Sequence, residues 1–175
     1  MICIVASTNR VPSVSIQMAN YYASLLKEKN IESCILDLSK LPEDFAFSAL
    51  YENNSKNEAF NEFIADAKKA DQFLFVVPEY NGSFPGVIKT FIDALPYPSI
   101  LKGKLMTLTG ISSGPMGTAL GLSHLTDILN YLGAIVNPMK VRIPSIEKNF
   151  SSTEGILNDV IMKAIEEQLL FLSKY

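Results

Sequence analysis

Residues 73–95 read FLFVVPEYNGSFPGVIKTFIDAL, an apolar run, a polar loop and a second apolar pattern in one continuous stretch. The run 73–77 is typical of a buried strand, and the apolar side chains between Val87 and Leu95 recur at the spacing of one helix face. A strand, a loop and a helix in this order form the repeating unit of a parallel α/β sheet. Ligands of such sheets bind at loops that follow the carboxyl ends of the strands. We therefore expect the loop before Val87 to border a binding site.

This loop, residues 78–85, concentrates groups that bind ligands. It carries a carboxylate, a phenol, an amide and a hydroxyl around Gly82, with a proline at each end that restricts the backbone. The residues concerned are Pro78, Glu79, Tyr80, Asn81, Gly82 and Ser83. An ordinary surface turn is the alternative interpretation, because Asn-Gly is a common turn pair.

Apolar patterns elsewhere predict further strands that alternate with helices. The predicted strands are 1–6, 31–38, 71–77, 104–109 and 134–141, and the predicted helices are 13–29, one that ends near 69, 87–95, one that ends near 132, and 154–173. Segment 39–57 is the least regular, Gly133 is a helix stop, and Pro138 favours an edge position for the last strand. These lengths predict an α/β fold with a five-stranded parallel sheet, strand order 2-1-3-4-5, and helices on both faces.

Length and composition narrow the class of protein. The chain has 175 residues, which fits a single domain over 1–175. Its formal net charge of −3 offers no broad basic field to attract nucleic acid or anionic lipid. The first residues lack the basic start and the length of a signal or membrane segment. Cys3 and Cys34 lie in apolar strand patterns and are interpreted as small buried residues, so we expect a cytoplasmic protein without nucleic-acid or membrane partners.

The predicted strand order brings the loops after strands one, three and four to one crevice. The first loop leads into a helix N-terminus, whose free N–H groups and positive dipole end favour an anion. Thr8, Ser13 and Ser15 add hydroxyls, and Arg10 adds a charged fork that suits phosphate. The alternative is that Ser13 only caps the helix while Arg10 is solvated.

The third loop, residues 110–117, is rich in small residues that allow a ligand to approach the backbone closely. Ser112, Ser113, Gly114 and Gly117 are its candidate binding residues. The phosphate-loop pattern GxxxxGK[ST] is missing, which argues against a Mg²⁺-dependent nucleotide triphosphatase. No GxGxxG follows the first strand, which argues against a Rossmann dinucleotide site.

Between Pro78 and Asp93 the chain resembles the NADPH-dependent FMN reductase family. These flavodoxin-like proteins often show PEYN followed by a small residue, a proline, a glycine and a helix that contains Lys and Asp. The resemblance implies a three-layer flavodoxin-like fold, with FMN phosphate at the first loop and the isoalloxazine ring at 78–83. It also implies that the third loop meets the pyrimidine edge of the ring. Here Ala6 or Ser7 stands where the family usually has a glycine.

The resemblance further implies an FMN-dependent oxidoreductase. NADPH or NADH gives a hydride to N5 of the flavin, and the electrons pass to a small-molecule acceptor such as a flavin, a quinone or an azo compound. A homodimer or homotetramer is implied, with a neighbouring subunit at the flavin. Because the cofactor carries the chemistry, no catalytic acid–base residue and no metal site is predicted, and the direction of Glu79 stays open. The lone His124 is assigned no role.

Two other functions and one other cluster stay open. An electron carrier of the same fold would hold FMN without NAD(P)H reductase activity, although such carriers tend to be strongly acidic. A phospho-receiver would need carboxylates after the first strand, where Ser7 and Thr8 stand. The aromatic side chains Phe45, Phe47 and Tyr51 could cover the pocket, meet another subunit or pack on the sheet.

Overall fold

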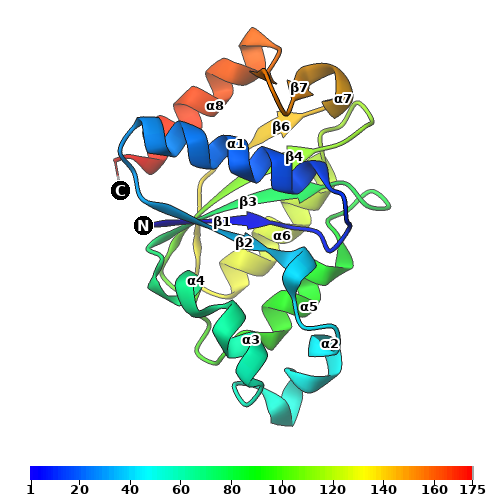
Figure 1. Ribbon diagram of the computed structural model, residues 1–175, viewed down its shortest axis with the longest axis vertical. Coiled ribbons are helices and arrows are strands. Elements are labelled where there is room, and N and C mark those ends of the chain that lie inside the picture. The colour runs from blue at the N-terminus through cyan, green and yellow to red at the C-terminus, as the bar shows by residue number, and fades with distance from the viewer. Residues whose placement is uncertain (175) are drawn as a thin grey trace.

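A parallel sheet with the order β2-β1-β3-β4-β5 forms the centre of the protein in a computed structural model that describes residues 1–174 (Figure 1). Its strands are β1 Ile2–Ala6, β2 Ser33–Asp37, β3 Gln72–Pro78, β4 Leu105–Ile111, β5 Ile135–Val136 and β6 Val141–Ile143, of which β6 also pairs with β4. All of these pairings are parallel. The predicted α/β fold and its strand order are confirmed.

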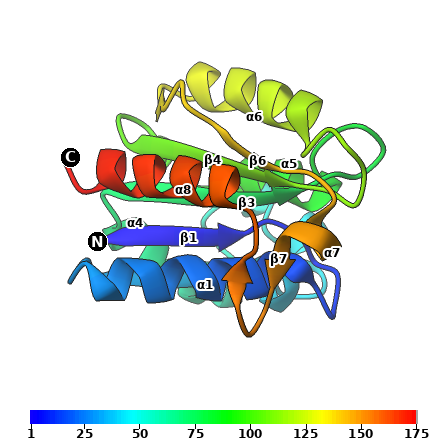
Figure 2. The ribbon, with the colours of Figure 1, turned by 90° about the horizontal axis from the view of Figure 1, so that it is seen from above.

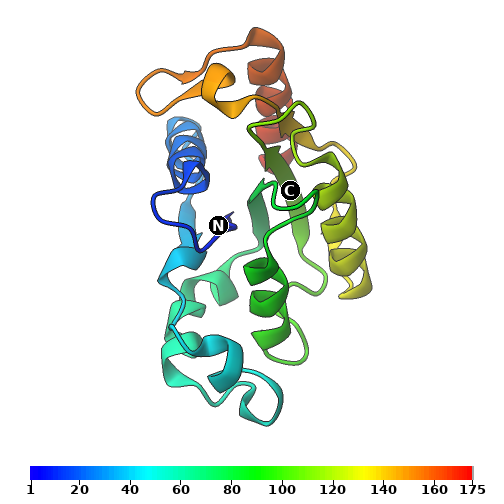
Figure 3. The same ribbon diagram turned by 90° about the vertical axis from the view of Figure 1, so that its right-hand side faces the viewer.

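Helices cover both faces of the sheet because alternate strand side chains point to opposite sides. Ile2, Ile4 and Ala6 pack with α1 Val14–Glu28 and α8 Asp159–Leu172. Cys3 and Val5 face the other core, which is built from α3 Glu58–Phe63, α4 Ala65–Lys69, α5 Gly86–Ala94 and α6 Ala119–Tyr131. Figures 2 and 3 show α1 and α6 on opposite sides of the sheet. No helix within residues 1–174 is long and apolar enough to cross a membrane.

The irregular segment after β2 contains only short turns of helix. These are the 3₁₀ turns Leu38–Lys40 and Tyr51–Asn53 and the short helix α2 Phe45–Ser48. Phe45 is buried and stacks on Phe60, with ring centroids 6.1 Å apart, so this aromatic residue packs in the core. Phe47 and Tyr51 are 86% and 84% exposed and line no part of the crevice described below.

The predicted boundaries of three elements were wrong. The helix that ends at Lys69 is two helices, α3 and α4, because the helix is interrupted at Ile64. The last strand is split around Pro138 into β5 and β6, which pair with successive parts of β4. The C-terminal helix begins at Asp159, not at Glu154, because Asn158 caps the N–H groups of Val160 and Ile161.

The residues before α8 form a hairpin that sequence periodicity did not predict. After α7 Ile146–Asn149, strands β7 Phe150–Ser151 and β8 Gly155–Ile156 pair antiparallel. Gly155 has φ +80°, a left-handed conformation that a helix interior excludes. A Cβ atom at Gly155 would lie 2.5 Å from the Tyr21 ring. The hairpin therefore depends on glycine for both its turn and its packing on α1.

Gly155→Ala is expected to lower the free energy of unfolding by about 2 to 4 kcal/mol, the sum of a left-handed alanine and an overpacked contact. The matched control is Gly103→Ala, since Gly103 has φ +73° but no atom within 4 Å of an added Cβ. That control should cost only about 1 kcal/mol. Urea denaturation of both variants measures the difference. Equal losses would show that the Tyr21 contact contributes nothing.

Candidate functional site

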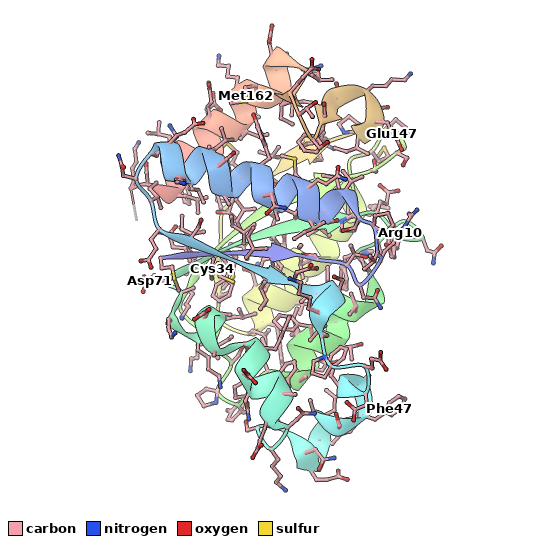
Figure 4. The ribbon with its side chains drawn as sticks, viewed as in Figure 1. Arg10, Cys34, Phe47, Asp71, Glu147 and Met162 are labelled. Atoms are coloured by element: carbon pink, nitrogen blue, oxygen red, sulfur yellow. The ribbon has the colours of Figure 1, made fainter. Side chains whose placement is uncertain are left out.

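A cavity of about 390 Å³ opens at the carboxyl ends of β1, β3 and β4. It is lined by residues of the three predicted loops together with the start of α1 and α7: Thr8, Arg10, Ser13, Ser15, Pro78, Glu79, Tyr80, Ser112, Ser113, Ile146 and Glu147 among others. A shallower hollow beside it shares Arg10, Glu79 and Tyr80 and adds Asn9 and Asn81. Figure 4 shows Arg10 and Glu147 at this end of the sheet, opposite Cys34 and Asp71. The predicted convergence of the three loops is confirmed.

The first loop uses some of its hydroxyls to hold its own shape. Ser13 Oγ accepts a hydrogen bond from the N–H of Ile16, so Ser13 is the N-cap of α1. The Thr8 hydroxyl lies 2.8 Å from the Tyr80 hydroxyl and accepts from the N–H of Arg10. Thr8 therefore joins the first loop to the central loop.

Two groups of this loop stay available to a ligand. The Ser15 side chain lines the cavity, and its hydroxyl makes no hydrogen bond within residues 1–174. Arg10 is exposed at the rim, and its guanidinium likewise has no ion-pair partner in that range. Arg10 is also the one basic side chain among the residues that line the cavity. This combination at the start of α1 fits an anion.

The central loop is a tight turn that glycine makes possible. The backbones of Tyr80 and Ser83 exchange two hydrogen bonds of 2.9 and 3.0 Å, and Asn81 and Gly82 have φ values of +52° and +71°. No atom lies within 4 Å of a Cβ added to Gly82. Glycine is thus favoured here by the turn itself. Gly82 and Ser83 do not line the cavity, whereas Pro78, Glu79 and Tyr80 do.

The Glu79 side chain has a definite direction. Its Oε2 atom accepts a hydrogen bond of 3.0 Å from the N–H of Thr118, the residue that precedes α6. The orientation that the sequence left open is therefore toward α6. This contact ties the first half of the central loop to the helix that follows the third loop.

The third loop is closed by its own serine. Ser112 Oγ donates to the carbonyl of Gly114 and accepts from the N–H of Gly117, at 2.8 and 2.9 Å. A Cβ atom on Gly117 would lie 2.9 Å from Cβ of Arg142, so this glycine allows the loop to pack on β6. Neither Gly114 nor Gly117 lines the cavity, so of the four predicted residues of this loop only Ser112 and Ser113 lie with the other loops, together with Ile111.

Ile146 and Glu147 also line the cavity, although no sequence pattern predicted them there. They belong to α7, a helix of four residues that follows β6, and no periodicity marks so short an element. Glu147 Oε1 accepts a hydrogen bond of 2.9 Å from Ser113, which brings a second carboxylate to the cavity beside Glu79. Within the part of the chain that the structure describes, no group of three His, Cys, Asp or Glu side chains is arranged to hold a metal ion.

The sequence profile of the NADPH-dependent FMN reductases matches residues 1–147 of this chain. The chain belongs to this family. A 2-hydroxy-1,4-benzoquinone reductase from a Burkholderia species is 31% identical to this FMN reductase over 99% of the chain and 93% of the relative. An FMN-dependent NADPH-azoreductase from Staphylococcus aureus is 28% identical over 89% of the chain and 84% of the relative.

Solved structures confirm the flavodoxin-like fold of this FMN reductase, among them a flavodoxin from the domain Archaea, with a TM-score of 0.60, 12% identity, and coverage of 99% of this chain and 98% of that structure. The flavoenzyme NAD(P)H:acceptor oxidoreductase FerB from Paracoccus denitrificans superposes with a TM-score of 0.75, 22% identity, and coverage of 99% of this chain and 93% of that structure. At that identity the likeness concerns the fold. Family membership confirms the predicted enzyme class, an oxidoreductase that uses FMN with NAD(P)H as donor.

Proposed function

We propose that this FMN reductase binds FMN in the cavity between its three loops and reduces a quinone as its principal acceptor. The observation that carries the proposal is the convergence of Arg10, the Ser15 hydroxyl and the start of α1 at one end of a cavity bordered by the central loop. A helix N-terminus with a fixed positive charge suits a phosphate. The quinone is supported by the Burkholderia relative, which is named for a quinone and aligns over almost the whole chain.

The residues present fit FMN in kind and position. Arg10, Ser15 and the first N–H groups of α1 would hold the phosphate, and Pro78, Tyr80 and Asn81 would border the ring. Thr8 acts indirectly, because its hydroxyl holds the Tyr80 hydroxyl. Bound FMN supplies a ring that takes a hydride from a nicotinamide and passes two electrons to an acceptor. The protein binds, orients and shields the reactants.

Three measurements test this function. Purified protein should bind FMN, anaerobic NADPH or NADH should bleach the flavin absorbance, and a benzoquinone should then restore it. Failure to bind FMN would overturn the proposal, and bound flavin that neither nicotinamide bleaches would point to an electron carrier instead. An azo dye that restores the absorbance faster than any quinone would replace the quinone as principal acceptor.

The donor and the acceptor are expected to bind in turn. Both need the open side of the site beside Tyr80 and Asn81, where the shallower hollow adjoins the cavity. Initial-rate plots against NADPH at several fixed quinone concentrations should therefore give parallel lines. Intersecting lines, together with a ternary complex detected by equilibrium dialysis, would contradict a shared position.

The proposal also includes an oligomeric state and a cellular location. The exposed aromatic side chains Phe47, Tyr51 and Tyr97 support a homodimer or homotetramer, since such side chains are enriched at protein interfaces. Light scattering during size-exclusion chromatography tests this, and a monomer at micromolar concentration would contradict it. A cytoplasmic location is proposed because the enzyme draws on NAD(P)H.

A further inference from the structure

Helix α6 and the residue before it, Thr118, contact the central loop at three positions spaced three residues apart. The N–H of Thr118 donates to Glu79, and Nδ1 of His124 lies 2.9 Å from Oγ of Ser83. Between them, Gly121 approaches the loop so closely that an added Cβ would lie 2.8 Å from the Ser83 carbonyl carbon. Gly121 and His124, three residues apart within α6, lie on one face of the helix. Figure 3 shows the green loop after β3 reaching α6.

His124 hydrogen-bonds to Ser83 at an exposed position, where its side chain contributes little to the stability of the fold. His124 is exposed, so its ring does not fill the core. Ser83 is its hydrogen-bond partner, and no other partner of its ring is found in residues 1–174. Removing the ring therefore leaves no buried polar group without a hydrogen-bond partner. The contact instead acts on the turn 80–83, whose last residue it holds against α6.

The turn is held at both of its ends. The Tyr80 hydroxyl meets Thr8 of the first loop at 2.8 Å, and Ser83 meets His124 on α6. Between these anchors, Asn81 and Gly82 are exposed and take left-handed conformations. Without the anchor at Ser83, the second half of the turn keeps only its own backbone bonds and the close packing on Gly121.

We propose that His124 is a positioning residue that fixes the central loop for the flavin ring through its hydrogen bond to Ser83. This inference rests on the proposed function, because it assumes that the ring lies at the central loop. His124 acts through Ser83 and the turn, at a distance from the phosphate-binding groups. Its loss should therefore affect every ligand that carries the ring, with or without a phosphate.

The binding test uses Ser83→Ala and His124→Ala with apoprotein titrated by FMN and by riboflavin. Each variant is expected to weaken both ligands about 3- to 10-fold, the range for one neutral hydrogen bond. His124→Asn places an amide near the level of Nδ1 and should restore most of the affinity. Asp127→Ala is the matched control, because Asp127 is exposed on α6 and its side chain makes no hydrogen bond or ion pair within residues 1–174. Its affinities should equal those of the unaltered protein.

A second readout needs no flavin. Amide hydrogen exchange of residues 79–84 in the apoprotein should speed up in Ser83→Ala and His124→Ala at unchanged melting temperature, and remain unchanged in Asp127→Ala. The double variant should lose no more affinity than either single variant, because both remove the same bond.

The outcomes separate the two proposals. If the unaltered protein binds no FMN, the proposed function fails. If the unaltered protein binds FMN, any of three results would show that the positioning role of His124 is wrong while the proposed function stands. These results are full affinity in both single variants, unchanged hydrogen exchange in both single variants, and losses of affinity that add up in the double variant. A loss confined to FMN would also overturn the positioning role, since it would place His124 at the phosphate.

Discussion

Arg10→Ala is expected to weaken FMN binding about 10- to 150-fold and to leave riboflavin binding nearly unchanged. The two ligands share the ring and the ribityl chain and differ by the phosphate. A hydrogen bond to a charged group contributes about 1.5 to 3 kcal/mol, which sets that range. The structure supports the test, because the Arg10 guanidinium lies at the rim of the cavity beside the start of α1. Titration of apoprotein with each ligand measures the two affinities.

Arg142→Ala is the matched control for charge, since Arg10 and Arg142 are the two arginines of the chain. Arg142 is exposed on β6 and does not line the cavity. Its loss should leave both affinities unchanged. Only Arg10→Ala should flatten the salt dependence of FMN binding, because one charged contact has gone. Equal weakening of both ligands in a folded Arg10→Ala protein would show that Arg10 shapes the loop or meets the ring.

Gln168→Leu is expected to lower the free energy of unfolding by about 2 to 5 kcal/mol, because it leaves buried polar groups of α1 and β4 without their hydrogen-bond partner. Gln168 Oε1 accepts from Tyr22 at 2.7 Å and from Thr109 at 3.1 Å, and its Nε2 donates to the carbonyl of Leu108 at 3.1 Å. The network joins α1, β4 and α8, and its side chains are fully buried. Urea denaturation measures the loss.

Gln72→Leu is the matched control. Gln72 is also buried and donates to the carbonyl of Leu172, but its Oε1 already lacks a hydrogen-bond partner within the described chain. Replacing it removes one bond and also relieves one unpaired atom, so the change in unfolding free energy should stay below about 1 kcal/mol. Equal losses for both variants would mean that the network around Tyr22 adds no stability.

The same network predicts an alkaline limit to stability. Burial raises the pKa of Tyr22 well above its ordinary value, although the hydrogen bond with Thr109 opposes this. The unfolded chain then loses the Tyr22 proton near pH 10 while the folded chain keeps it, so this residue contributes a fall in stability above pH 10 and none below it. Tyr22→Phe should remove that part of the slope. An unchanged slope would assign the alkaline loss to other groups.

Local sequence patterns were sufficient to predict the order of the strands and the end of the sheet at which the cavity lies. Apolar runs and helical spacings predicted the strand order, and the order alone implied that the loops after β1, β3 and β4 meet. Residues 73–95 also carried the family resemblance that the profile match confirmed. The break at Ile64 was missed because it lies inside a stretch whose composition suits a helix, whereas the start of α8 was missed although asparagine, here Asn158, is a preferred N-cap residue.

The sequence by itself determined which loops border the cavity, since neighbouring side chains and their periodicity decide where each strand ends. Only the tertiary structure decided which residues of those loops face it. Glu79 turns to Thr118, Gly117 packs on Arg142, and Glu147 joins Ser113 from a helix without a pattern of its own. Each of these contacts joins residues at least 25 positions apart, so its geometry depends on how whole elements pack and leaves no trace in local spacing. The partnership of Ser83 with His124 has the same origin, because a lone histidine acquires a role only from the element that folding brings beside it.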